Sequence, residues 1–220
     1  MTISSVLIAN RGEIAVRIIR AAKALGLRTV QVYSHADAGS LAVQLADEAI
    51  DIGPPAAKKS YLNIEAVLAA AKAAKVDAIH PGYGFLSENA DFAEAVVAAG
   101  MKFVGPDASA IRLLGDKVAA RQVAARAGVP TVPGSDGRVS DITEAAAIVA
   151  RIGFPVMIKA AAGGGGRGIR IAHTLEDFER HFPQASAEAA AAFGDGGLYI
   201  EKVIEKARHV EVQILGDGRN

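Results

Sequence analysis

Residues 6–33 read VLIANRGEIAVRIIRAAKALGLRTVQVY and contain one complete strand, helix, strand pattern. The first four letters form a short apolar run that predicts a strand. Ile14 and Ile18 then begin an apolar helical face, and Gly26 supplies the stop. Residues 29–33, which alternate between polar and apolar side chains, predict a second strand. A unit of this kind predicts two parallel strands joined by a right-handed crossover.

Strands and helices continue to alternate as far as residue 115. The sequence predicts a helix over 64–75, a strand ending at 78–80, a helix capped by Ser87 and running towards Gly100, a strand over 102–104, and helices beginning at Asp107 and Asp116. Such alternation is typical of a doubly wound α/β domain with a parallel sheet, here over residues 1–115.

A second region begins after the turn-rich stretch VPTVPG at residues 129–134. It contains a helix over 143–152, a strand ending at Lys159, a returning strand over 169–171, a helix opened by Thr174 and a strand over 198–201. This order predicts a small α+β unit over residues 131–203, of a size suited to a lid.

A glycine-rich segment joins the strand that ends at Lys159 to the returning strand. It consists of Gly163, Gly164, Gly165, Gly166, Arg167 and Gly168. Glycine lacks a Cβ, so backbone N–H groups in such a run can surround an anion. Lys159 and Arg167 add positive charge on either side of it. The segment therefore predicts a flap over a polyphosphate, most simply that of ATP. The alternative from these residues alone is a mobile loop without a ligand.

Two better-known glycine motifs fit this segment poorly. Gly163, Gly165 and Gly168 satisfy G-x-G-x-x-G, but a strand follows them where a dinucleotide fingerprint needs a helix. No Lys-Ser or Lys-Thr follows, which excludes a Walker A loop. Glu13 also argues against NAD at the first strand–helix turn, because a carboxylate at a helix N-terminus repels phosphate.

Composition narrows the functional class. The 220 residues contain 24 basic and 24 acidic side chains, so no global field attracts nucleic acid or an anionic membrane. There is no cysteine, the histidines lack metal-binding spacing, and no apolar run is long enough to cross a bilayer. We expect a cytoplasmic protein that binds neither nucleic acid nor membrane and holds no zinc.

Near the end of the chain, residues 209–215 alternate apolar and polar side chains and predict an amphipathic strand. Gly216, Asp217 and Gly218 predict a turn directly after it. A strand followed by half a hairpin lacks a complete sheet. We therefore expect the chain to be part of a longer protein, or one half of a split one.

Several of these motifs together resemble biotin carboxylase. They are IANRGEIA at 8–15, HPGYGFLSEN at 80–89, GDK at 115–117, the glycine segment, and RHVE at 208–211. The resemblance covers the whole chain in order. It implies an ATP-grasp fold preceded by an α/β domain, and an enzyme that uses Mg-ATP and bicarbonate to carboxylate biotin on a carrier protein or domain.

The resemblance also implies roles for individual residues. Lys117 and Lys159 correspond to the two lysines at the nucleotide, and Gly163, Gly164, Gly165, Gly166, Arg167 and Gly168 to the phosphate-covering flap. Glu201, Lys202, Val203 and Ile204 correspond to the segment along the adenine edge, and His209 to a residue near the ribose. Without the resemblance, Glu201 and His209 would be read as solvent-facing, and a solvated helix residue is the alternative for Lys117. The loop at 80–84 would face biotin and bicarbonate.

The implied organisation has four parts: an α/β domain over 1–115, a connecting helix and linker over 116–130, an ATP-grasp lid over 131–203, and the start of an incomplete ATP-grasp body over 204–220. Magnesium ligands are expected beyond Asn220, so this chain alone is expected to be inactive. Expected partners are a biotin carrier, a carboxyltransferase and a second subunit in a homodimer, within fatty-acid or acyl-CoA metabolism. A stand-alone nucleotide-binding module, or the corresponding part of pyruvate or urea carboxylase, are the alternatives.

Overall fold

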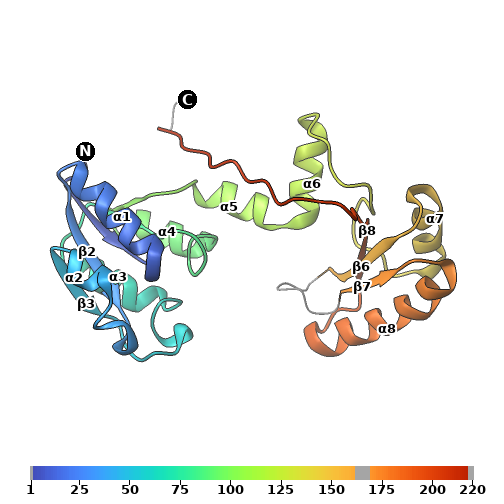
Figure 1. The fold of residues 1–220 in the computed structure, drawn as a ribbon, viewed down its shortest axis with the longest axis horizontal. Helices are drawn as coiled ribbons and strands as arrows, with labels where there is room; N and C mark the ends of the chain where they lie inside the picture. Colours follow the sequence, from blue (N-terminus) through green and yellow to red (C-terminus); the bar gives the residue numbers. More distant parts are fainter. Residues whose placement is uncertain (1, 162–168, 218–220) are drawn as a thin grey trace. The chain divides into compact units, whose positions relative to one another are not determined.

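The computed structural model describes residues 2–161 and 169–217, without the side chains of Lys117, Val118 and Phe193. It divides into two compact units, residues 1–120 and 121–220, and each is treated by itself (Figure 1). The division falls inside α6 (Lys117–Arg126). A two-unit division does not test the finer boundaries at 130 and 203, which stay predictions.

The first unit is built on a parallel five-stranded sheet of order β3-β2-β1-β4-β5. Its strands are β1 (Ser5–Ile8), β2 (Arg28–Tyr33), β3 (Glu48–Asp51), β4 (Ala78–His80) and β5 (Lys102–Phe103). Strand β1 is central: Val6 lies opposite Thr29 on one side and opposite Ala78 on the other. The parallel pairing confirms the predicted fold class.

Helices cover both faces of this sheet. They are α1 (Gly12–Ala24), α2 (Leu41–Leu45), α3 (Ile64–Ala73) and α4 (Ala90–Ala98), and α5 (Ala108–Gly115) packs against α4. Val6 and Ile8 pack into one apolar cluster with α1, whereas Leu7 packs into another with α3 and α4. Because neighbouring side chains of β1 enter opposite cores, the unit is doubly wound.

The structure corrects one predicted helix start. Helix α4 begins at Ala90, and its N-cap is Asn89, whose side chain accepts a hydrogen bond from the Phe92 N–H at 2.8 Å. Ser87 instead lies in a turn, where its N–H donates to the Gly84 carbonyl. Asn89 is as good a cap as serine, and it lies two residues further along the chain.

The second unit contains an antiparallel sheet of order β7-β6-β8. Its strands are β6 (Val156–Ala160), β7 (Arg170–Ala172) and β8 (Leu198–Lys202), and its further helices are α7 (Ile142–Ile152) and α8 (Leu175–Phe193). Val156 and Ile158 pack against Phe178 of α8 within one apolar cluster. The antiparallel pairing of β6 with β7 confirms that the glycine segment connects a hairpin.

The strand predicted over residues 209–215 is wrong for this structure. The segment has no regular secondary structure, and Val210, Val212 and Ile214 are 77–81% exposed. An amphipathic strand is stable only when neighbouring strands take its hydrogen bonds and a core takes its apolar face. Among the described residues, no neighbouring strand pairs with this segment and no core covers its apolar side chains. In the same described ranges, no helix is long and apolar enough to cross a membrane.

Asp77 ties the amino ends of β1 and β4 together. Its Oδ2 accepts hydrogen bonds from the hydroxyls and N–H groups of Ser4 and Ser5, at 2.7–3.0 Å. These bonds, led by the one from the Ser4 hydroxyl, lower the pKa of Asp77 from 3.8 to about 2. The folded state therefore prefers the ionised carboxylate more strongly than the unfolded chain does.

We predict that this preference contributes to acid sensitivity. A lowered pKa stabilises the fold above about pH 4, and that stabilisation is lost as the pH falls towards 2. Asp77→Asn should lower stability at neutral pH and flatten its decline between pH 4 and 2. Urea unfolding at several pH values measures this. Glu65→Gln, an exposed carboxylate on α3, is the control, and an equal acid slope in both variants would contradict the prediction.

Candidate functional site

The sheet of the second unit packs against α7 and α8 with one face, and its opposite face, the open face, carries five paired side chains. Met157 lies opposite Glu201 on β8 and opposite Ile171 on β7, and Lys159 lies opposite Tyr199. Directly paired residues share a face, so these five side chains stand together, opposite the face that packs on α7 and α8. Ile171 is 41% exposed. This face thus combines an accessible apolar surface with one cation and one carboxylate.

Lys159 and Glu201 form an ion pair across β6 and β8. Both side chains are only about a quarter exposed, at 26% and 22%. The pairing fixes the Lys159 ammonium near the end of β6, three residues before the stretch 162–168 begins. The six predicted flap residues, 163–168, lie outside the described residues.

The segment after β8 crosses back over the start of β6. The Lys202 N–H donates to the Pro133 carbonyl at 2.8 Å, and the Val203 N–H to the Pro155 carbonyl at 3.0 Å. The Lys202 ammonium donates to the carbonyls of Gly153 and Phe154, so its side chain holds the end of β8 against the segment before β6 and acts as a brace between them. In the described part of the chain, the N–H of Ile204 has no hydrogen-bond acceptor. It is a free donor on a half-exposed residue.

Tyr199 and Arg121 extend the same face. Tyr199 is 6% exposed, and within the described residues its hydroxyl has no hydrogen-bond partner. The Arg121 guanidinium lies 5.4 Å from its ring centroid and donates to the Val132 carbonyl at 2.7 Å. Burial raises the pKa of Tyr199. Sequence reasoning missed both residues. The period of two along β8 would place Tyr199 beside Glu201, but nothing in the sequence singles out Arg121.

The structure therefore brings Lys159 and Glu201 together, and Lys202, Val203 and Ile204 follow Glu201 directly in the chain. The remaining predicted residues are less clearly placed. Lys117 begins α6, whose N-cap Asp116 accepts from the Ala119 N–H at 2.7 Å, but its side chain is outside the described part. His209 is 85% exposed on the irregular segment, with its Nε2 3.5 Å from Glu211 Oε2. These assignments stay predictions.

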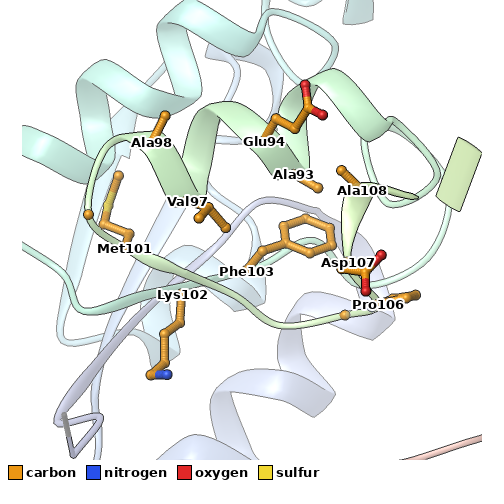
Figure 2. Close-up of a pocket in the computed structure, with 12 residues that line it drawn as sticks. Ala93, Glu94, Val97, Ala98, Met101, Lys102, Phe103, Pro106, Asp107 and Ala108 are labelled. Atoms are coloured by element: carbon orange, nitrogen blue, oxygen red, sulfur yellow. The ribbon is translucent and has the colours of Figure 1, made fainter. Parts of the chain in front are cut away.

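A large cleft lies elsewhere, in the first unit. It measures about 960 Å³ and is bounded by α4, β5 and the start of α5. Figure 2 shows Phe103 at its centre, near Val97 and Pro106. Glu94 on its rim is paired with Arg112, and Asp107 caps α5. The lining is mostly apolar and includes none of the predicted nucleotide residues.

Across the residues that the structure describes, no cluster of three or more His, Cys, Asp or Glu side chains could hold a metal ion. The open face of the second unit carries the Lys159 ammonium, paired with the Glu201 carboxylate, beside the apolar side chains of Met157 and Ile171. Those features suit a flat base carrying a negatively charged tail.

Comparison with known protein families gives two adjoining matches. The model described as biotin carboxylase, N-terminal domain, matches residues 2–111. The model described as carbamoyl-phosphate synthase L chain, ATP binding domain, matches residues 116–220. The two matches meet near the division between the two structural units.

Individual relatives agree with these families. Biotin carboxylase 1 of Bacillus subtilis is 56% identical over 216 residues, which is 98% of this chain and 48% of that protein. The mitochondrial propionyl-CoA carboxylase alpha chain of Sus scrofa is 51% identical over 98% of this chain and 30% of its own length. The chain thus spans about half the length of the biotin carboxylase that it matches.

Solved structures show the same fold. A biotin carboxylase complex with βγ-ATP from Campylobacter jejuni superposes with a TM-score of 0.83 and 50% identity, over 93% of this chain and 46% of that one. The biotin carboxylase domain dimer of Hydrogenobacter thermophilus 2-oxoglutarate carboxylase, in complex with MgADP, ADP and bicarbonate, gives 0.81 and 49%, over 93% and 45%.

The Lys159–Glu201 pair generates a stability prediction. Removing one partner leaves the other partly buried and unpaired, so Lys159→Met and Glu201→Gln should each destabilise the second unit. The double variant should lose less free energy of unfolding than the sum of the two single variants. The coupling energy should be about 1 kcal/mol, a value between those of fully exposed and fully buried ion pairs. Urea unfolding of the four proteins measures it. Strictly additive effects would show that the pair is not coupled.

Proposed function

Because the chain belongs to the biotin carboxylase family, we propose that it supplies the nucleotide-binding part of an enzyme that carboxylates biotin with ATP and bicarbonate. The observation that carries the proposal is the open face of the second sheet. There Lys159 stands beside the glycine-rich connection and on the same unit as the free N–H of Ile204. The family resemblance alone would not require these groups to be available.

The residues present fit ATP. The apolar side chains of Met157, Ile169 and Ile171 offer a surface for the base, and the Ile204 N–H offers a donor to its edge. Lys159 offers a charge-assisted bond to a phosphate. When bound, ATP would supply the energy for joining bicarbonate to biotin.

The other predicted residues complete the proposed site. Arg167 and the glycines 163–166 and 168 would cover the phosphates from the hairpin, and Lys117 would supply a second cation. Glu201, Lys202 and Val203 would lie along the adenine edge, and His209 near the ribose. For Glu201 the ion pair adds a second task, because its carboxylate holds the Lys159 ammonium in place before a phosphate arrives.

Further components are proposed from the relatives. Magnesium would be held outside the described residues, which lack a suitable cluster. Biotin would arrive on a carrier protein or domain, and a carboxyltransferase would consume the product. The domain dimer of the 2-oxoglutarate carboxylase supports a homodimer. We place the protein in the cytoplasm, with a final acceptor in acyl-CoA or related metabolism.

The direct test uses a polypeptide of the relatives' length that contains this sequence. We predict ATP hydrolysis that depends on bicarbonate and increases with free biotin, measured by phosphate release. ATP binding without any biotin-dependent turnover would contradict the proposal. It would favour a stand-alone nucleotide-binding module.

A second prediction concerns the two lysines. In the same polypeptide, Lys117→Ala or Lys159→Ala removes a cation next to a phosphate, a contact worth about 1.5–3 kcal/mol. The resulting loss in kcat/KM for ATP should be about ten- to a hundredfold. Lys58→Ala removes an exposed lysine of the first unit and serves as the control. Unchanged ATP kinetics in both site variants would show that neither lysine meets the nucleotide.

A further inference from the structure

The order of strands in the first unit defines a crevice. From β1 the chain passes through α1 to β2 on one side, and it later returns to β4 on the other side of β1. The winding direction therefore reverses between β1 and β4. In open α/β sheets, ligands bind outside the carboxyl ends of the strands at this point. Here the two segments at the crevice are residues 9–12 and 81–84.

Asn10 closes this crevice with its side chain. It is 3% exposed, and its Nδ2 donates to the carbonyls of both Pro81 and Tyr83, each at 2.7 Å. Its Oδ1 accepts from the Arg11 N–H at 2.8 Å. One buried amide thus uses both of its N–H donors to hold the loop that follows β4.

The position of Asn10 is itself fixed from two sides. The Nε2 of Gln31, a buried residue of β2, donates to the Asn10 carbonyl at 2.7 Å. Gly82 lies against it with φ of +66°. A Cβ at Gly82 would stand 2.9 Å from Asn10 Nδ2 and 3.2 Å from Ile14 Cγ1. The contact therefore leaves no room for a side chain at residue 82.

The side chain of Tyr83, whose carbonyl is held by Asn10, is exposed to solvent. It is 62% exposed, and its hydroxyl donates to the carboxylate of Glu13 in the first turn of α1. A carboxylate at a helix N-terminus occupies the place that a phosphate takes in dinucleotide folds and repels one. This edge of the sheet is therefore suited to a substrate other than the nucleotide.

We infer that Asn10 is a positioning residue, which holds residues 81–83 so that Tyr83 faces a substrate other than the nucleotide. If the proposed function is correct, that substrate is biotin rather than bicarbonate, because the Glu13 carboxylate repels an anion, and this identification rests on the proposed function. The positioning itself rests on the hydrogen bonds of Asn10 and the contact with Gly82.

The first experiment tests positioning without activity. Asn10→Asp replaces two N–H donors by a carboxylate oxygen that faces two carbonyls. In the 220-residue chain, we expect amide hydrogen exchange across residues 82–87 to accelerate about tenfold or more, with β1 and β4 unchanged. The control is Asn63→Asp, because Asn63 caps α3 through its oxygen alone, which accepts from the Ala66 N–H at 3.1 Å. Equal exchange in both variants would overturn the inference.

Two glycines provide a second test if Asn10→Asp does not fold. Gly82 and Gly84 have φ of +66° and +67°, so alanine brings similar backbone strain at both. Only at Gly82 does the new Cβ meet Asn10, since at Gly84 nothing lies within 4 Å. Gly82→Ala should accelerate exchange across 82–87 clearly more than Gly84→Ala. Equal acceleration would show that the Asn10 contact does not hold the loop.

The final experiment measures the consequence in the polypeptide of the relatives' length. Asn10→Asp should raise KM for free biotin about tenfold and leave KM for ATP within about twofold, while Asn63→Asp behaves as the parent. Equal changes in both KM values would indicate a purely structural role and overturn the inference. If the parent itself cannot use biotin, the proposed function fails. The exchange measurements then still decide the role of Asn10.

Discussion

The first unit depends on the complete burial of one four-residue strand. All four residues of β1 are buried, and the strand is hydrogen-bonded in register to β2 on one side and β4 on the other. Its side chains enter two separate cores, so helices must cover both faces of the sheet. A polar residue at Val6, Leu7 or Ile8 would disrupt one core or the other, whereas Ser5 is tolerated because it is hydrogen-bonded to Asp77. The crevice at its carboxyl end is a direct result of that central position.

The second unit follows a different rule. Strand β6 alternates strictly, with Val156, Ile158 and Ala160 buried while Met157 and Lys159 are half-buried. One face of the sheet packs on α7 and α8, and the other is the face that the proposed function assigns to the nucleotide. The same period of two thus produces both the core and the opposite face.

The sequence was sufficient where patterns are local. The alternation of strands and helices over residues 6–104 predicted the parallel sheet, and the capping residues Asp107 and Thr174 predicted helix starts that the structure contains. It failed where stability depends on distant partners. Strand β3 has only half-buried and exposed residues and was not predicted, because its stability comes from pairing with β2. Likewise, periodicity over 209–215 predicted a strand although no neighbour is described for it.

The candidate site shows the same limit. The approach of Lys159 to Glu201 joins residues 42 positions apart, and the role of Lys202 as a brace depends on carbonyls almost 50 positions away. The resemblance implied that Lys159 meets the nucleotide and that Lys202 lies along the adenine edge. Only the register of β6 with β8 shows that one of them is already paired and the other is engaged with the backbone.

The pairing of Lys159 also bears on ligand selectivity. Since its ammonium group already has a carboxylate partner in a partly buried place, an incoming anion does not meet a bare cation. If a phosphate binds Lys159 as proposed, binding exchanges one counter-ion for another, and a ligand gains from it only when it carries more charge than a carboxylate. Chloride and simple organic acids, each with a single charge per group, would offer no such gain. On the proposed function, the resting ion pair would therefore favour polyphosphates over the common small anions.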